Sequence, residues 1–180
     1  LLGTSSLAFW VNTTQLGGAN GAGNSWNLPT VIGSEQSGGR NDIQWGTIND
    51  TGKIGFGIGN VTGVYSTTRI DDNAWHQVAI TRDAATKLVH VFVDGRLESS
   101  GSPNDAAFTA TLNRLAGFSA TNVFANDAAG TNMVDNHFLR ADLDDVRIYT
   151  RALNNAEISA IYSVGTPPAG QPSPANDTYN

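Results

Sequence analysis

Three aspartates stand close together near the C-terminal end of the sequence, at Asp142, Asp144 and Asp145. They border a short alternating run that contains Val146 and Ile148, which is the pattern of a β-strand with one buried face. If Val146 and Ile148 face inward, a period of two places Asp144 on the same inward side. A carboxylate at the edge of a core needs a partner, because burying an unpaired charge is costly.

Two kinds of partner could satisfy an inward Asp144. Calcium is one, since this cation prefers carboxylate and carbonyl oxygens as ligands. The alternative is ordinary hydrogen bonding to loop N–H groups, or an ion pair with an arginine such as Arg151. Asp145 points the other way along the strand and is expected to pair with a surface arginine.

Two polar stretches each combine an aromatic ring with amide and carboxylate groups. The first, 38–46, contains Asn41, Asp42 and Trp45. The second, 124–137, contains Phe124, Asp127, Asn132, Asp135 and Asn136. A sugar offers hydroxyl groups and a weakly apolar face, so ring, amide and carboxylate together suit it. The two stretches therefore predict one rim site with Trp45 or Phe124 as the platform, whereas the alternative places Trp45 in the core and leaves both loops solvated.

The remaining polar residues do not form a catalytic pattern. Retaining glycoside hydrolysis needs two carboxyl groups about 5–5.5 Å apart, and none of the three glutamates, Glu35, Glu98 and Glu157, has a second acid two or four residues on. A serine nucleophile elbow of the form G-x-S-x-G is also missing. His76 and His90 lie in expected strands and are predicted to be structural, which leaves His137 as the histidine with a possible functional role. We therefore expect no enzyme activity.

The elements that must position these residues are mostly strands. Apolar and polar residues alternate in many short segments that are separated by turn residues, which is typical of a two-sheet sandwich. The expected strands are 6–14, 27–33, 42–49, 53–60, 61–69, part of 69–83, the hairpin 87–101, 112–118 and 143–150. Within 53–60, Ile54, Phe56 and Ile58 share one face, and glycines occupy the other, so another surface or a ligand can approach the backbone closely there.

Local signals specify one turn and one helix. Asp94-Gly95 is the dipeptide of a type I′ hairpin turn. Asn154 followed by Glu157 is a capping box, and it predicts a short helix near 154–163. The Pro/Ser-rich end predicts a linker over 165–180 that follows a single domain over 1–164.

Composition excludes several classes of function. The formal net charge is −6 and only ten residues are Lys or Arg, which disfavours nucleic acid, whose phosphates need clustered cations. No apolar run approaches the roughly 20 residues of a membrane span, so membrane insertion is not expected. The chain contains no cysteine, so disulfides give no information about its compartment.

Three blocks of sequence carry a resemblance to a known family. They are "DDNAWHQVAITRD" (71–83), "VHVFVDGRLESSG" (89–101) and "LDDVRIYTRALNNAEISAIY" (143–162). In order and spacing they resemble laminin-G-like domains of the concanavalin A-like lectin/glucanase superfamily. The resemblance spans roughly 6–164 and implies a jelly-roll sandwich that binds sugars or proteins, often with calcium. In related glucanases the matching aspartate ligates a structural calcium, which implies that role for Asp144.

These observations lead to one functional expectation and two alternatives. We expect a non-catalytic, lectin-like module, associated with calcium, that binds a glycan or cell-surface polysaccharide. Its parent would be a larger secreted or cell-surface bacterial protein such as an adhesin. The alternatives are a protein-binding or spacer domain in such a protein and, more distantly, a glycoside hydrolase.

Overall fold

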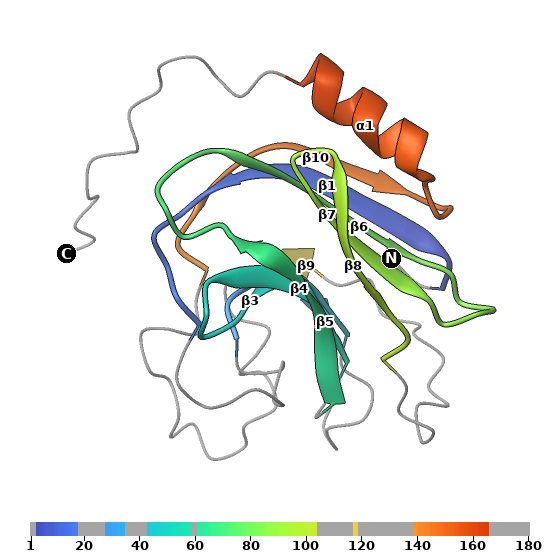
Figure 1. The fold of residues 1–180 in the computed structure, drawn as a ribbon. Coiled ribbons are helices and arrows are strands. Elements are labelled where there is room, and N and C mark those ends of the chain that lie inside the picture. The colour runs from blue at the N-terminus through green and yellow to red at the C-terminus, as the bar shows by residue number, and fades with distance from the viewer. Residues whose placement is uncertain are drawn as a thin grey trace.

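The computed structural model describes residues 3–17, 28–34, 43–58, 61–103, 117–118 and 139–165. In this part of the chain two antiparallel sheets face each other, and one helix lies on the outside (Figure 1). The predicted all-β jelly-roll sandwich with a short C-terminal helix is therefore confirmed.

Each sheet has five described strands. Sheet A contains, in spatial order, β10 (Asp142–Tyr149), β1 (Ser5–Asn12), β6 (His76–Arg82), β7 (Val89–Val93) and β8 (Arg96–Gly101). Sheet B contains β5 (Val61–Arg69), β4 (Lys53–Ile58), β3 (Ile43–Ile48), β2 (Thr30–Ser34) and β9 (Gly117–Phe118). The β7–β8 hairpin turns at Asp94 (φ 50°) and Gly95 (φ 74°), the two positive φ values predicted for that dipeptide.

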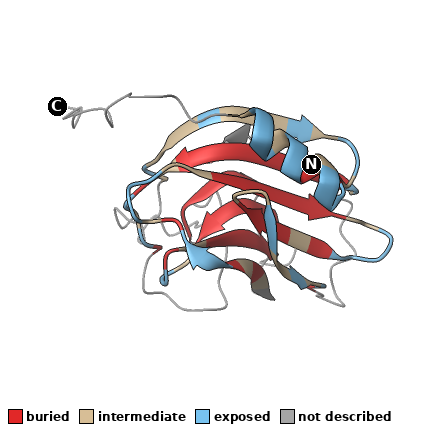
Figure 2. Ribbon diagram, turned by 45° about the horizontal axis from the view of Figure 1, so that its top comes forward, coloured by how far each residue is buried: buried red, intermediate tan, exposed pale blue. Residues whose placement is uncertain are grey.

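The core lies between the two sheets and follows the predicted alternation. Leu7, Phe9 and Val11 of β1 face Ile54 and Phe56 of β4 across it, and all five side chains are almost fully buried. Burial is concentrated on the central strands of both sheets (Figure 2). Removing this apolar surface from water is the main force that holds the sheets together.

Helix α1 (Asn155–Val164) covers part of the outer face of sheet A. Its capping box is present: the Asn154 side chain accepts a hydrogen bond from the Glu157 N–H (3.0 Å), and the Glu157 carboxylate accepts one from the Asn154 N–H (2.9 Å). Ile158 packs against Ala8 and Phe92 in a second, smaller apolar cluster. The sequence signals therefore specify both where the helix begins and which residue anchors it.

Side chains connect the two sheets where the edge strands β5 and β8 meet. The Glu98 carboxylate accepts hydrogen bonds from the N–H groups of Thr67 and Thr68, each at 2.9 Å. The Ser99 hydroxyl donates to the Tyr65 carbonyl at 2.7 Å. Glu98 therefore occupies backbone donors that an edge strand would otherwise expose, which is a structural role.

The prediction that Asp144 faces inward is wrong. Trp10 pairs with Asp144 and Ala8 with Arg147, so β10 carries an extra residue there, and Asp145 takes a positive φ of 48°. This β-bulge reverses the alternation, so Val146 still packs on the core while Asp144 is exposed. The prediction for Asp145 is confirmed, since its carboxylate accepts a hydrogen bond from Arg147 Nε at 2.7 Å.

Candidate functional site

The outer face of sheet B brings together small residues and polar side chains. Trp45, Phe56 and Val64 pair across β3, β4 and β5 and face the core. The adjacent ladder positions therefore face outward. They form two cross-strand rows, which are Gly33, Gln44 and Gly57, and Thr47, Gly55 and Tyr65. We call this surface the glycine face and define it by these six residues.

The glycines of this face are required by close packing. A Cβ atom on Gly33 would lie 2.2 Å from the Gln44 Oε1 atom, so only glycine lets the Gln44 side chain lie across β2. A Cβ atom on Gly55 would lie 2.0 Å from the Val64 carbonyl oxygen. On this side of β4 the glycines therefore allow neighbouring atoms to approach the backbone closely, as the alternation predicted.

Gln44 is the most unusual residue of the glycine face. Its side chain is fully buried, yet neither Oε1 nor Nε2 has a hydrogen-bond partner among the residues that the structure describes. A buried amide normally satisfies both groups, and leaving one unsatisfied costs about 1–3 kcal/mol. Because the amide has no exposed surface, a ligand that both donates and accepts hydrogen bonds would recover this free energy only by displacing the atoms that cover it.

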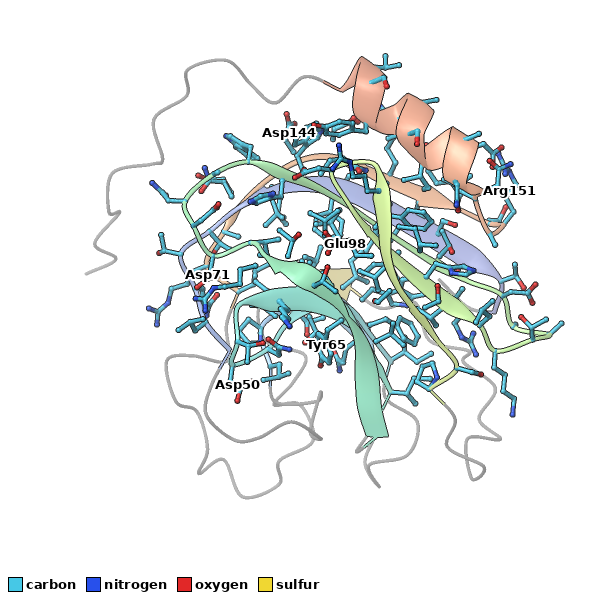
Figure 3. All side chains as sticks on the ribbon, in the orientation of Figure 1. Asp50, Tyr65, Asp71, Glu98, Asp144 and Arg151 are labelled. Atoms are coloured by element: carbon cyan, nitrogen blue, oxygen red, sulfur yellow. The ribbon has the colours of Figure 1, made fainter. Side chains whose placement is uncertain are left out.

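Thr47 and Tyr65 add a hydroxyl group and a ring beside this amide. The Thr47 hydroxyl is buried and lies close enough to Tyr65 to lower the pKa of the phenol slightly, but its geometry is not that of a hydrogen bond with any group in the described part of the chain. Burial, together with the Asp50 carboxylate, raises the pKa of Tyr65 well above its ordinary value, so the phenol keeps its proton. A Cβ atom on Gly63 would lie 2.9 Å from Tyr65 Cε2, which places the ring against that glycine. Figure 3 shows Tyr65 and Asp50 on the sheet B side of the molecule.

This set of groups is suited to binding a polar ligand. The amide can donate and accept, the phenol can donate, and an aromatic ring can stack on an apolar surface. The two described glutamates make contacts elsewhere: Glu98 is held by β5, and Glu157 by the helix cap and Arg151. The hydrolytic alternative would need two carboxyl groups placed about a bound sugar.

Most residues of the predicted rim site lie outside the described part of the chain. These are Asn41, Asp42, Phe124, Asp127, Asn132, Asp135 and Asn136, together with His137. The segment 35–42 begins after Ser34 of β2, and the segment 119–138 begins after Phe118 of β9. Because β2 and β9 pair antiparallel, the two segments leave this strand pair at opposite ends.

Trp45 lies in the core. It is 1% exposed, and its ring contacts Phe56 edge to face with 4.8 Å between ring centroids. The alternation of β3 explains this, since Trp45 points to the opposite side of the sheet from Gln44. The prediction of Trp45 as a sugar platform is therefore corrected, and the alternative prediction of a core tryptophan agrees with the structure. Sequence reasoning missed Gln44, although its orientation away from the core follows from the same alternation.

Asp144 offers one carboxylate to a metal ion but no acidic cluster. Its Oδ1 atom accepts a hydrogen bond from the Asp145 N–H at 2.8 Å. Figure 3 shows it beside the C-terminal end of α1, on the outer side of sheet A. Among the described residues, no group of three His, Cys, Asp or Glu side chains could hold a metal ion. Any calcium bound at Asp144 would need carbonyl oxygens, water or residues outside those described.

The fold is that of a lectin-like β-sandwich. A laminin-G family model, described as the concanavalin A-like lectin/glucanases superfamily, matches residues 2–159. The chain belongs to this superfamily. No curated protein matches it in sequence. In the described part of the chain, no helix is long and apolar enough to cross a membrane.

Solved structures with a similar fold are toxin binding domains. The binding domain of Paraclostridial mosquitocidal protein 1 has a TM-score of 0.53 and 17% identity, with 90% of this chain and 37% of that chain covered. Botulinum neurotoxin type C, whose cell entry depends on two ganglioside molecules, gives a TM-score of 0.54 and 16% identity over 90% and 36% of the chains. The binding domain of botulinum neurotoxin serotype G gives 0.53 and 18% over 91% and 36%. The chain thus spans little more than a third of the length of these structures, and the likeness shows the fold.

Proposed function

We propose that this domain is a non-catalytic carbohydrate-binding module that holds a glycan on the glycine face of sheet B. The observation that carries the proposal is the fully buried Gln44 amide, which has no hydrogen-bond partner within the described ranges. Sugar hydroxyls both donate and accept hydrogen bonds, so they can satisfy an amide, a hydroxyl and a phenol together. The binding of gangliosides by a toxin of similar fold supports a sugar rather than another polar ligand.

We propose that the predicted loop residues contribute to the same site. Asn41 and Asp42 belong to the segment that follows β2, and Phe124, Asp127, Asn132, Asp135 and Asn136 belong to the segment that follows β9. A glycan of several sugar units lying along the glycine face would reach both. In this proposal Phe124 and Tyr65 are the aromatic platforms, because Trp45 is in the core. The parent protein would be secreted or displayed on the cell surface.

Changing Tyr65 to alanine is expected to weaken glycan binding at least about tenfold, because a lost ring contact and hydrogen bond together are worth more than 1.4 kcal/mol. The measurement is a glycan array followed by calorimetric titration of the tightest glycan. Tyr162→Ala is the matched control, since Tyr162 is 39% exposed on the helix that covers sheet A.

Asp42→Ala and Asp127→Ala should also lose affinity, whereas Asp105→Ala should keep it. Wild-type affinity in the Tyr65, Asp42 and Asp127 variants would place the site elsewhere.

Calcium remains a prediction centred on Asp144. An ion that binds only the folded protein stabilises it by mass action, by about 2.7 kcal/mol at a concentration 100 times Kd. EDTA should then lower the melting temperature by about 5–10 °C in a domain of this length, and Asp144→Ala should remove that response. Asp83→Ala, a change in an exposed turn, should retain it. Identical melting curves in excess calcium and in EDTA, with elemental analysis showing that EDTA has removed the calcium, would rule out the site.

Protein binding is the second candidate function. Ile148 is 54% exposed although it lies opposite the buried Leu7 in β10, the outer strand of sheet A. An apolar side chain on the outer strand of a sheet is a feature of strand-addition interfaces. Failure of every glycan to bind the array would favour this candidate.

A further inference from the structure

His76 has a carboxylate at each ring nitrogen. Its Nδ1 atom lies 2.9 Å from Asp94 Oδ2, and its Nε2 atom lies 3.2 Å from Asp72 Oδ1. The imidazole is mostly buried, with 12% of the side chain exposed. Sequence analysis predicted only an ordinary strand residue at this position, since neither aspartate is adjacent to it in the chain.

This geometry distinguishes the two protonation states of the ring. The imidazolium carries an N–H on both nitrogens and can donate to both carboxylates. The neutral ring has one N–H, so it must turn a lone pair toward one of the two aspartates. The contact with that aspartate then changes from attractive to repulsive.

We propose that His76 is an acid-strengthened latch. When the ring is protonated, its two N–H groups bind Asp72 and Asp94 and so hold the segment 71–75 and the β7–β8 turn against the start of β6. Loss of the proton releases the segment or the turn from the ring. The latch lies on sheet A and is independent of the glycine face on sheet B.

Each side of the latch is connected to a further element. Asp94 exchanges two hydrogen bonds with Gln77, one through its backbone N–H (2.8 Å) and one through Oδ1 (3.0 Å). Gly95, the next residue of the turn, accepts a hydrogen bond from the Ser159 hydroxyl of α1 at 3.2 Å. On the other side, the Asn73 N–H donates to the Thr13 carbonyl at 3.1 Å. Opening the latch would therefore weaken the contacts that hold α1 and the end of β1 in place.

The charged groups that act on the ring are the two aspartates. The pKa of His76 is raised. The hydrogen bond to Asp94 is the largest cause, Asp72 raises the pKa further, and burial of the ring acts in the opposite direction. β1 places the uncharged Val11 opposite His76, and the acidic residue of α1, Glu157, is paired with Arg151. Burial acts to raise the pKa of Asp72, but hydrogen bonds from the Ala74 N–H and from His76 outweigh it, and that pKa is lowered.

These two shifts define the pH window of the latch. Because the pKa of His76 is higher in the folded state, its stabilisation is complete below the ordinary value of 6.5 and is lost as pH rises through the raised value. Because the pKa of Asp72 is lower in the folded state, its contribution is present above 3.8 and is lost as pH falls through the lowered value. The latch is therefore closed in mildly acidic solution and opens toward alkaline pH.

Two measurements on the intact domain test the proposal. An NMR titration of the histidine rings should show one imidazole, identified as His76 by its loss in His76→Gln, titrating above about 6.5. Asp72→Asn, which leaves the Asp94 contact in place, should lower that titration point. The melting temperature should also fall by about 2–4 °C between about pH 6 and about pH 8.5 in the parent, relative to His76→Gln.

His90→Gln is the matched control. His90 is also on sheet A, but its Nδ1 atom faces the neutral Ser100 hydroxyl at 2.6 Å, so this variant should retain the pH dependence of the parent. A His76 ring that titrates at or below 6.5 in the folded domain would overturn the proposal. An equal pH dependence of melting in the parent and His76→Gln would overturn it as well.

Discussion

Replacing Trp45 with alanine is expected to lower the free energy of unfolding by about 3–5 kcal/mol, the cost of removing a large aromatic side chain from a packed core. Trp45 is 1% exposed and contacts Phe56 edge to face. In a domain of this length the melting temperature should fall by about 6–20 °C. Chemical denaturation followed by circular dichroism measures this loss.

The same variant separates a core role from a binding role. Trp45→Phe, which keeps an aromatic ring in the core, should lose much less stability than Trp45→Ala. A Trp45→Ala protein that melts with the parent and loses only its glycan affinity would contradict the structure and restore Trp45 as a platform.

Replacing Gln44 with leucine should separate stability from binding. The side chain is buried and makes no hydrogen bond to the described residues, so an apolar residue of similar volume removes an unsatisfied amide. The variant should be at least as stable as the parent, and up to about 1–3 kcal/mol more stable. Glycan affinity should fall about tenfold to a hundredfold, because the ligand loses its amide partner. A residue that costs stability but is needed for a ligand is typical of a functional site.

The chain offers a matched control for Gln44→Leu. Gln77 is also a buried glutamine with an unpaired Oε1 atom, but it lies on sheet A. Gln77→Leu should therefore leave glycan affinity unchanged. Equal losses of affinity in the two variants would indicate a general effect on folding rather than a contact with the ligand.

Local sequence patterns predicted the elements well because each depends on neighbouring residues. Ile54, Phe56 and Ile58 alternate with glycines and form β4, and Asn154 with Glu157 begins the helix at the predicted place. The bulge that turns Asp144 outward was not predictable, since it depends on how β10 pairs with β1 and not on a local signal.

The candidate site was predictable only in part. The glycine side of β4 was recognised as a surface that a ligand could approach, but Gln44 and Tyr65 reach it from β3 and β5. Strand order and register decide which side chains meet there, and neither can be read from the sequence of one strand. The contacts of His76 with Asp72 and Asp94 and of Glu98 with β5 are tertiary for the same reason.

The most direct test of the central claim follows the Gln44 side-chain amide itself. Its two N–H protons give an NMR signal that Gln44→Leu assigns, and the tightest-binding glycan from the array is titrated into labelled protein. The proposal predicts saturable shifts of this signal and of the Gly55, Gly57 and Tyr65 backbone amides, while the Gln77 side-chain signal stays in place. Saturable glycan binding that leaves the Gln44 amide and these backbone amides unshifted would contradict a site on the glycine face.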